Sequence, residues 1–153
     1  MTAQEGLEVR LARGAAATQE IGANLALALS PGAVIGLCGP LGAGKTVMVR
    51  GAVQALGGDP RTVRSPTFTL LNIYPCSPRV YHFDLYRLHS SDDLEGIGFF
   101  EFTHADGITF IEWADRFPEV EQLLTVRVDI AFAGEEDTRE VSLKWLPAGG
   151  REA

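Results

Sequence analysis

Residues 39–46 read Gly-Pro-Leu-Gly-Ala-Gly-Lys-Thr and match the phosphate-loop pattern G-x-x-x-x-G-K-[ST]. The glycines of such a loop let backbone N–H groups surround phosphate oxygens, and the amino end of the next helix adds a positive partial charge. Lys45 is placed to neutralise the β- and γ-phosphates, and the Thr46 hydroxyl to coordinate Mg²⁺. The sequence therefore predicts a nucleoside triphosphate site formed by Gly39, Pro40, Leu41, Gly42, Ala43, Gly44, Lys45 and Thr46.

The lysines bear on which base is bound. A guanine-specific GTPase normally carries an Asn/Thr-Lys-x-Asp element, and this chain has lysine only at Lys45 and Lys144. Lys144 lies in Leu-Lys-Trp, which does not fit that element. We therefore expect ATP with Mg²⁺ rather than GTP.

Two carboxylates are candidates for a hydrolytic step, which needs an acid near the magnesium and a group that positions water. Asp84 lies within the apolar run 80–86, and Glu112 follows the run 108–111. Strand ends of this kind approach the ligand crevice of α/β sheets. From the residues alone, each could equally be an outward-facing carboxylate on a half-exposed strand.

Other polar and aromatic residues give less specific patterns. In Ser65-Pro66-Thr67-Phe68-Thr69, hydroxyls flank a rigid proline, which is compatible with a switch that senses the γ-phosphate. By residue type, four aromatic residues are more typical of a core than of base stacking: Phe99, Phe100, Phe102 and Trp113. Three histidines lack metal-ligand spacing, and we assign them no metal role: His82, His89 and His104.

The elements that must position these residues follow from periodicity and turn residues. Strands are predicted at 7–11, 33–38, 67–74, 79–86, 107–113, 125–132 and 138–146. Helices are predicted from a Thr18 cap to about residue 29, over 45–56, and briefly after Ser90 or Ser91. The last two strands form a hairpin across 133–137, and 149–153 is a frayed tail. The order of elements indicates one α/β domain over residues 1–153.

The distribution of charge along the sequence narrows the range of possible functions. Residues 1–89 carry eight Lys and Arg against five Asp and Glu, whereas residues 90–153 carry five against fifteen. This acidic balance argues against autonomous binding of nucleic acid. The acidic half is interpreted as a solubilising face in preference to a docking surface for a basic partner.

The cellular compartment is also constrained. The uncharged stretch 21–44 is interrupted by Pro31-Gly32 and by the loop glycines, so we expect no membrane span there, and the amino terminus lacks the pattern of a signal peptide. Cys38 and Cys76 have no CxxC spacing and are expected to be free thiols. These features predict a cytoplasmic protein.

The ordered blocks GPLGAGKT, SPTFTLLNIY, YHFDLYRL and FIEW resemble the TsaE (YjeE) family, the small bacterial ATPase subunit of tRNA threonylcarbamoyladenosine biosynthesis. The resemblance spans nearly the whole chain, and the middle blocks are more specific than the phosphate loop. Thr18 and Gly22, in a T-x-x-x-G pattern, also resemble the opening of the family.

The resemblance implies a single-domain P-loop NTPase sandwich with a mixed, mostly parallel central sheet and a C-terminal β-hairpin. It further implies slow ATP hydrolysis that depends on the partner proteins TsaD and TsaB, which carry the chemistry that modifies the adenosine next to the anticodon. This subunit would meet tRNA only indirectly, through the complex, in agreement with its acidic composition.

Roles carried over by position concern both catalysis and binding. Lys45 and Thr46 keep the phosphate and magnesium roles, Glu112 becomes a second magnesium-side ligand or water-orienting group, and Asp84 becomes a Walker-B-like acid. Nucleotide-binding roles extend to Thr67 and Thr69 in the switch, Trp113 beside the glutamate, and Thr18 and Arg139 near the adenine. Two departures from the family pattern are Ala114-Asp115 in place of a proline after Glu-Trp, and Phe68 in place of tyrosine.

Two other function classes share the same loop. A small-molecule kinase would need an acceptor site and usually an arginine-rich lid, for which Arg61, Arg64 and Arg87 are candidates. A nucleotide-dependent assembly module would bind ATP without hydrolysing it, and a phosphate loop alone does not exclude this.

Overall fold

The computed structural model describes residues 6–103 and 106–147, and these residues form one seven-stranded sheet with the order β1-β7-β6-β2-β5-β4-β3. The strands are β1 (Leu7–Arg13), β2 (Val34–Cys38), β3 (Leu71–Tyr74), β4 (Arg79–Asp84), β5 (Gly107–Glu112), β6 (Val126–Ala133) and β7 (Glu135–Trp145). The four central strands β6, β2, β5 and β4 are parallel, and each edge is completed by antiparallel pairing. The mixed sheet, parallel in its middle, confirms the predicted fold class.

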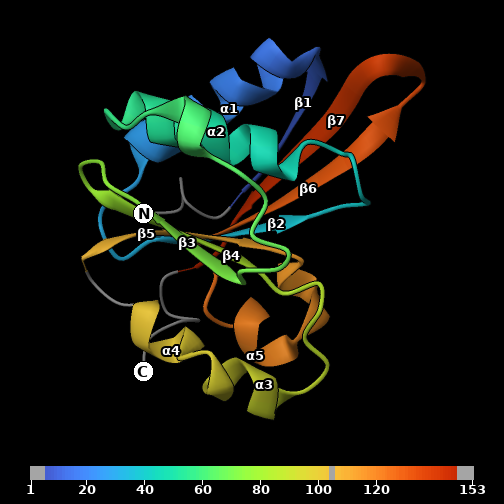
Figure 1. Ribbon diagram of the computed structural model, residues 1–153. Coiled ribbons are helices and arrows are strands. Elements are labelled where there is room, and N and C mark those ends of the chain that lie inside the picture. The colour runs from blue at the N-terminus through green and yellow to red at the C-terminus, as the bar shows by residue number, and fades with distance from the viewer. Residues whose placement is uncertain (1–5, 104–105, 148–153) are drawn as a thin grey trace.

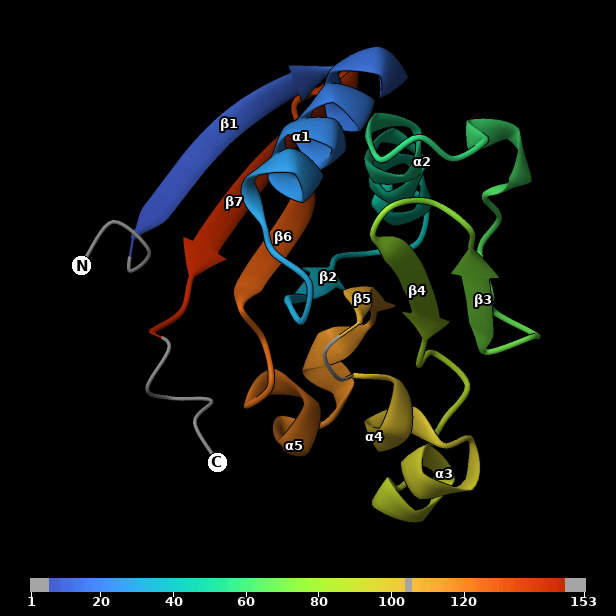
Figure 2. The same ribbon diagram turned by 90° about the vertical axis from the view of Figure 1, so that its left-hand side faces the viewer.

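Helices cover both faces of this sheet (Figures 1 and 2). The helices are α1 (Ala15–Ala28), α2 (Lys45–Ala55), α3 (Ser91–Gly96), α4 (Phe99–Phe102) and α5 (Pro118–Glu121), with 3-10 turns η2 (Pro60–Thr62) and η3 (Ala114–Arg116). The long helices α1 and α2 lie on one face, and the short helices α3, α4 and α5 lie on the other. Each layer buries its own apolar cluster against the sheet, so the domain is a three-layer sandwich.

The phosphate-loop helix α2 packs closely on α1. Gly22 of α1 faces the backbone of α2, and a Cβ at that position would lie 2.0 Å from the Met48 carbonyl oxygen. A side chain there would force the helices apart, since real Cβ atoms do not approach a carbonyl so closely. The glycine noticed in the T-x-x-x-G pattern is therefore a packing residue that sets the position of α2.

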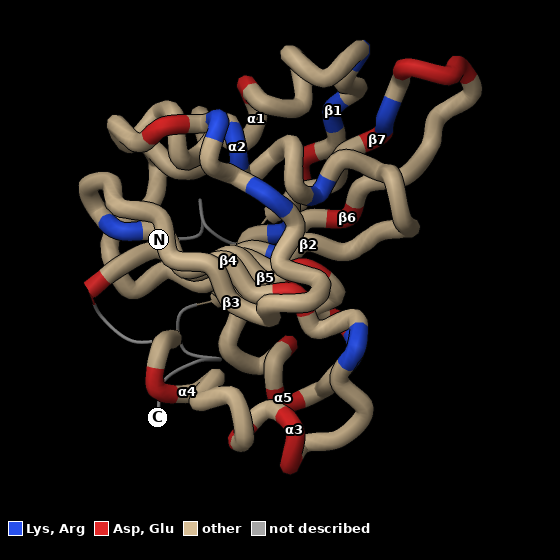
Figure 3. The backbone as a smooth tube through the Cα atoms, in the orientation of Figure 1, with Lys and Arg blue, Asp and Glu red and all other residues tan. Residues whose placement is uncertain are grey.

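Charge is divided between the layers (Figure 3). The short helices carry Asp92, Asp93, Glu95, Glu101, Glu119 and Glu121. The cap of α3 was predicted correctly: Ser90 accepts a hydrogen bond from the backbone N–H of Asp93, whose side chain bonds back to the cap. The short-helix layer thus carries six of the fifteen acidic residues of 90–153, and others lie on the strands β5, β6 and β7.

Three predicted boundaries were wrong. Thr18 is not a helix cap: α1 begins at Ala15 after Gly14, because β1 continues to Arg13 and pairs there with Thr138. The strand predicted at 67–74 begins only at Leu71, since the chain turns after Pro66 and Leu70 adopts a positive φ of 71°. The hairpin loop is shorter than 133–137, because β7 already starts at Glu135 after a bulge.

Other predictions had mixed outcomes. The strands at 33–38 and 107–113 and the helix at 45–56 were correct within one residue, whereas the short helices α4 and α5 were not predicted.

Phe99, Phe100 and Phe102 pack in the core, as predicted. Cys38 and Cys76 are free thiols, also as predicted. The expected tail at 149–153 and His104 lie outside the described residues. Across the residues that are described, no helix has the length and apolar character needed to cross a membrane.

Candidate functional site

The phosphate loop leaves the buried central strand β2 and enters α2 at Lys45. Gly44 precedes the helix with φ 114° and ψ 19°, a left-handed conformation that a side chain would strain. The loop therefore turns sharply at this glycine, and the first N–H groups of α2 point toward its mouth. Strand, loop and helix lie in the order that the sequence predicts.

Lys45 is folded back over the loop. Its Nζ donates hydrogen bonds to the carbonyl oxygens of Gly39 at 2.6 Å and Pro40 at 2.9 Å, and it lies 4.3 Å from the ring centroid of Trp113. Burial lowers the pKa of Lys45, and the negative charges of Glu112 and Asp84 oppose that shift. The buried ammonium group is thus held at the loop by two carbonyl oxygens and the face of Trp113.

The two candidate carboxylates lie side by side. Asp84 ends β4 and Glu112 ends β5, and the parallel register pairs these two residues directly. Their exposed fractions are 2% and 3%, so neither is an outward-facing surface acid. Because carboxyl ends of parallel strands meet at one edge of the sheet, both acids face the phosphate loop.

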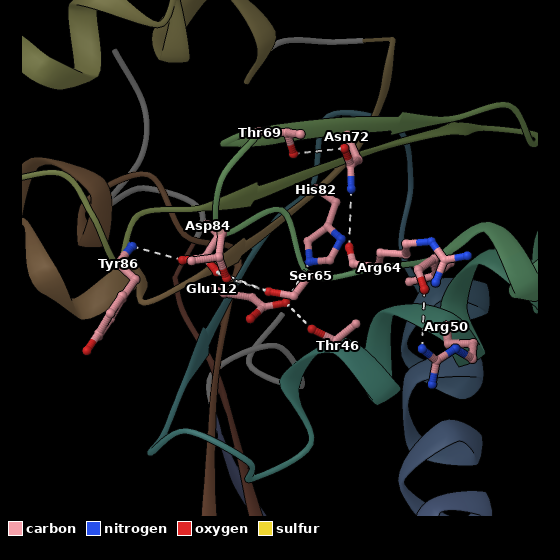
Figure 4. Close-up of polar contacts among 12 residues, drawn as sticks. Thr46, Arg50, Arg64, Ser65, Thr69, Asn72, His82, Asp84, Tyr86 and Glu112 are labelled. Atoms are coloured by element: carbon pink, nitrogen blue, oxygen red, sulfur yellow. Dashed lines mark hydrogen bonds and ion pairs between the residues drawn. The ribbon is translucent and has the colours of Figure 1, made fainter.

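Hydroxyl groups satisfy both carboxylates (Figure 4). Thr46 donates to Oε2 of Glu112 at 2.7 Å. Thr67 and Ser65 donate to Oδ2 of Asp84 at 3.0 and 3.3 Å, while the backbone N–H of Tyr86 donates to Oδ1 at 2.8 Å. The loop threonine and the Ser-Pro-Thr segment therefore converge on neighbouring acids, although they are separated by about twenty residues of chain.

These groups line a cavity of about 330 Å³, which we call the carboxylate pocket. Its walls are Leu41, Gly42, Gly44, Lys45, Thr46, Val47, Ser65, Thr67, Asp84, Tyr86, Glu112 and Trp113. The hard oxygen donors suit Mg²⁺, which commonly uses one or two carboxylates and completes its shell with phosphate oxygens and water. Within the described residues no group of three His, Cys, Asp or Glu side chains is arranged to hold a metal ion.

A second cavity, of about 230 Å³, lies on the other side of the loop, and we call it the arginine pocket. It is lined by Gly14, Ala15, Thr18, Gly42, Ala43, Gly44, Val47, Asp137 and Arg139. Arg139 donates from Nε to the Ala43 carbonyl oxygen at 3.1 Å, so β7 is tied directly to the phosphate loop. The two pockets share Gly42, Gly44 and Val47.

The structure brings together most of the predicted site residues. Trp113 lines the carboxylate pocket and, half-buried, also packs against the apolar cluster of the short-helix face, while its nucleotide-binding role stays a prediction. It has a positive φ of 63° and is followed by η3, where the resembling family has a proline. Thr69 is exposed, bonds to Asn72 at 3.1 Å and is not among the lining residues of either pocket.

Sequence reasoning missed two residues of this region. Tyr86 forms a wall of the carboxylate pocket and its ring lies 5.0 Å from that of Trp113. His82 is fully buried, and its Nε2 lies 2.7 Å from Oε2 of Glu112. The available signal was strand alternation: His82 lies two residues before Asp84 and therefore shares its face of the sheet.

The phosphate loop between a buried parallel strand and a helix, with two acids at neighbouring strand ends, defines a nucleotide-binding protein of the P-loop class. Residues 12–141 match the family model described as "Threonylcarbamoyl adenosine biosynthesis protein TsaE". The chain belongs to the TsaE family.

Individual relatives agree with that assignment. The chain is 40% identical over 95 residues to the "tRNA threonylcarbamoyladenosine biosynthesis protein TsaE" of Haemophilus influenzae, a match that covers 59% of this chain and 60% of that protein. It is 38% identical over 122 residues to the protein of the same name from Treponema pallidum, covering 77% of this chain and 90% of that one. A crystal structure of Bacillus subtilis YdiB superposes with a TM-score of 0.71 at 27% identity, over 93% of this chain and 87% of that one.

Proposed function

We propose that this chain binds ATP with Mg²⁺ and hydrolyses it in support of threonylcarbamoyl modification of tRNA adenosine. The observation that carries the proposal is the meeting of Lys45 and Thr46 with Asp84 and Glu112 in one cavity. The names of the relatives, which refer to tRNA threonylcarbamoyladenosine biosynthesis, supply the process.

Each group in the carboxylate pocket has a stated task. The loop amides and Lys45 bind the β- and γ-phosphates, and Thr46 contributes its hydroxyl to Mg²⁺. Glu112 acts as the second magnesium-side ligand or orients the attacking water, and Asp84 is the Walker-B-like acid. Bound Mg²⁺ supplies electrostatic stabilisation of the charge that develops on the transferred phosphoryl group.

The remaining nucleotide contacts divide between the two pockets. Thr67 hydrogen-bonds to Asp84, which suits a γ-phosphate sensor, whereas Thr69 contributes through the same segment without lining the pocket. Thr18 and Arg139 in the arginine pocket are assigned to the adenine side. Trp113 closes the carboxylate pocket beside Glu112.

We further propose that the protein is cytoplasmic and acts with TsaD and TsaB, and that it meets tRNA only through that complex. The acidic short-helix layer fits poorly with direct binding to a phosphate backbone. Slow hydrolysis by the isolated chain is expected, because the partners would complete the site and exclude water from the phosphates.

The decisive experiment measures ATP hydrolysis by the full chain alone, with TsaD and TsaB, and with each partner singly. We expect slow turnover alone and stimulation by both partners together, and Lys45→Ala should remove the stimulated rate while Lys144→Ala, the other lysine, should not. Rapid turnover that ignores the partners would contradict the proposal. A phosphorylated metabolite would indicate a kinase instead, and binding without hydrolysis an assembly module.

A further inference from the structure

His82 lies at the centre of a buried hydrogen-bond chain that the proposed roles do not use. It is fully buried on β4, and both ring nitrogens have partners: Nε2 lies 2.7 Å from Oε2 of Glu112, and Nδ1 lies 3.1 Å from the Tyr74 hydroxyl. An ionised carboxylate only accepts hydrogen bonds, so Nε2 must carry a proton. The Tyr74 hydroxyl lies 3.1 Å from Nδ1 and 3.2 Å from the Arg64 carbonyl oxygen, so it gives each ring nitrogen of His82 a hydrogen-bond partner and links the ring to Arg64.

The chain of hydrogen bonds continues from Tyr74 to Arg64, in the loop before the Ser-Pro-Thr segment. The backbone N–H of Arg64 donates to the Tyr74 hydroxyl at 3.2 Å. The Asn72 amide donates to the Arg64 carbonyl oxygen at 3.2 Å and accepts from Thr69 at 3.1 Å. Figure 4 shows the first part of this route, from Thr69 to Asn72 and from Asn72 to Arg64.

The segment 64–69 is consequently tied to both acids of the carboxylate pocket. Ser65 and Thr67 reach Asp84 directly, and Arg64 reaches Glu112 through Tyr74 and His82. Oε2 of Glu112 is shared between His82 and Thr46. If the Thr46 hydroxyl oxygen were to bind Mg²⁺, His82 would be the other group that holds Oε2 of Glu112 in place.

We propose that His82 is a positioning residue that orients Glu112 for hydrolysis and, through Tyr74, couples Glu112 to the segment 64–69. This inference rests on the proposed ATPase function. Removing a group that hydrogen-bonds to a metal-binding carboxylate commonly lowers metal affinity or activity by about 10- to 100-fold. Linked hydrogen bonds in a buried site also strengthen one another, so these hydrogen bonds act as a unit.

Two substitutions at the same position separate its two hydrogen bonds. In His82→Gln the side-chain amide nitrogen reaches the place of Nε2 and can donate to Glu112, whereas in His82→Asn the shorter amide reaches only the place of Nδ1 and its contact with Tyr74. We expect His82→Asn to lower kcat by about 10- to 100-fold, with the Kd for ATP changed by less than about threefold, and His82→Gln to recover most of kcat. Equal losses in both variants, in step with weaker binding and lower Tm, would assign His82 a merely structural role and overturn the proposal.

Tyr74→Phe tests the coupling without touching Glu112, and it keeps the test open if His82→Asn does not fold. Loss of the hydroxyl should make the Arg64 amide exchange its hydrogen about fivefold faster, the effect of one hydrogen bond. Because His82→Gln no longer contacts Tyr74, adding Tyr74→Phe to it should lower kcat by less than Tyr74→Phe does in the wild-type chain, whereas unchanged amide exchange or strictly additive effects would contradict a coupled network.

A spectroscopic readout separates this inference from the proposed function. Long-range ¹H–¹⁵N spectra of the wild-type chain should show His82 carrying a proton on Nε2, toward Glu112, without any nucleotide present. If the chain neither binds nor hydrolyses ATP even with its partners, the proposed function fails, and the role in hydrolysis fails with it. If hydrolysis is observed but His82→Asn keeps the wild-type kcat, or if Nε2 of His82 carries no proton, only the inference about His82 fails.

Discussion

The two pockets beside the phosphate loop are built in different ways. The carboxylate pocket gathers ionisable and hydroxyl groups from the carboxyl ends of two adjacent parallel strands, where pairing in register places Asp84 beside Glu112. The arginine pocket is formed by the start of α1 and by β7, which come from opposite ends of the chain. The parallel register of the central strands thus creates the carboxylate pocket, whereas the arginine pocket depends on where the antiparallel strand β7 and helix α1 lie relative to the loop.

This difference predicts a division of labour. The carboxylate pocket, with buried acids and a buried lysine, is suited to the phosphates, the metal and the chemistry. The arginine pocket presents mostly backbone and small side chains, with one guanidinium already bonded to the loop at Ala43. Substitutions in the first should change the rate or the recognition of the γ-phosphate, and substitutions in the second should change affinity for every adenine nucleotide alike.

The largest effect is expected for Glu112→Gln. The neutral amide keeps the shape of the side chain but cannot bind the metal side or orient water as a carboxylate does, so the partner-stimulated kcat should fall by about 100-fold or more. The Kd for ATP should change by less than about threefold, since the loop amides and Lys45 are untouched. Single-turnover hydrolysis and calorimetry measure the two quantities. Glu140→Gln, at an exposed position of β7, is the matched control. Unchanged hydrolysis with binding retained would remove Glu112 from the mechanism.

A smaller effect distinguishes the two pockets directly. Arg139→Ala should weaken ATP and ADP by the same factor, about five- to tenfold, because it releases the loop at Ala43 and leaves the γ-phosphate site intact. Thr67→Ala should weaken ATP more than ADP, because Thr67 lies beside Asp84 in the carboxylate pocket. Titrations of both nucleotides against both variants give the ratio, with Arg79→Ala, at the opposite end of β4, as a control. The same ATP to ADP ratio in both variants would contradict the division.

The smallest expected effect is the uptake of a proton by Lys45 when nucleotide binds. Burial lowers the pKa of Lys45 in the free protein, and the phosphates of a bound nucleotide raise it again. Between these two pKa values nucleotide binding takes up a proton, so affinity falls as the pH rises through that window. Calorimetry at alkaline pH in two buffers of different ionisation enthalpy should show this uptake, which should fade toward neutral pH, where Lys45 is protonated in both states. Proton release in place of uptake would contradict the assignment of Lys45 to the phosphates.

The sequence predicted correctly the features in which a residue type has one main structural use. The glycine and lysine positions of residues 39–46 can be recognised without a structure, because their spacing is what lets backbone amides and one lysine surround a phosphate. The buried strands β2 and β5 were visible as continuous apolar runs, and the Ser90 cap as a polar residue ahead of an acidic turn. Each of these features depends on neighbours along the chain.

Features that depend on distant neighbours were found less well. Thr18 looks like a helix cap, but Gly14 lies at the true start because β1 extends to pair with β7. The residues 67–70 have strand-forming types, yet the turn after Pro66 carries Thr67 to Asp84. His82 was dismissed for lack of metal-ligand spacing, although its partners Glu112 and Tyr74 lie on the two neighbouring strands.

The sequence by itself determined the phosphate loop, the α/β class and the two acids as candidates, since these follow from residue types and local periodicity. Only the tertiary structure decided that Asp84 and Glu112 are adjacent and buried, that Arg139 reaches the loop, and that His82 stands behind Glu112. Pairing between strands sets these distances, and strand register is a cooperative property of the whole sheet that short stretches of sequence do not specify.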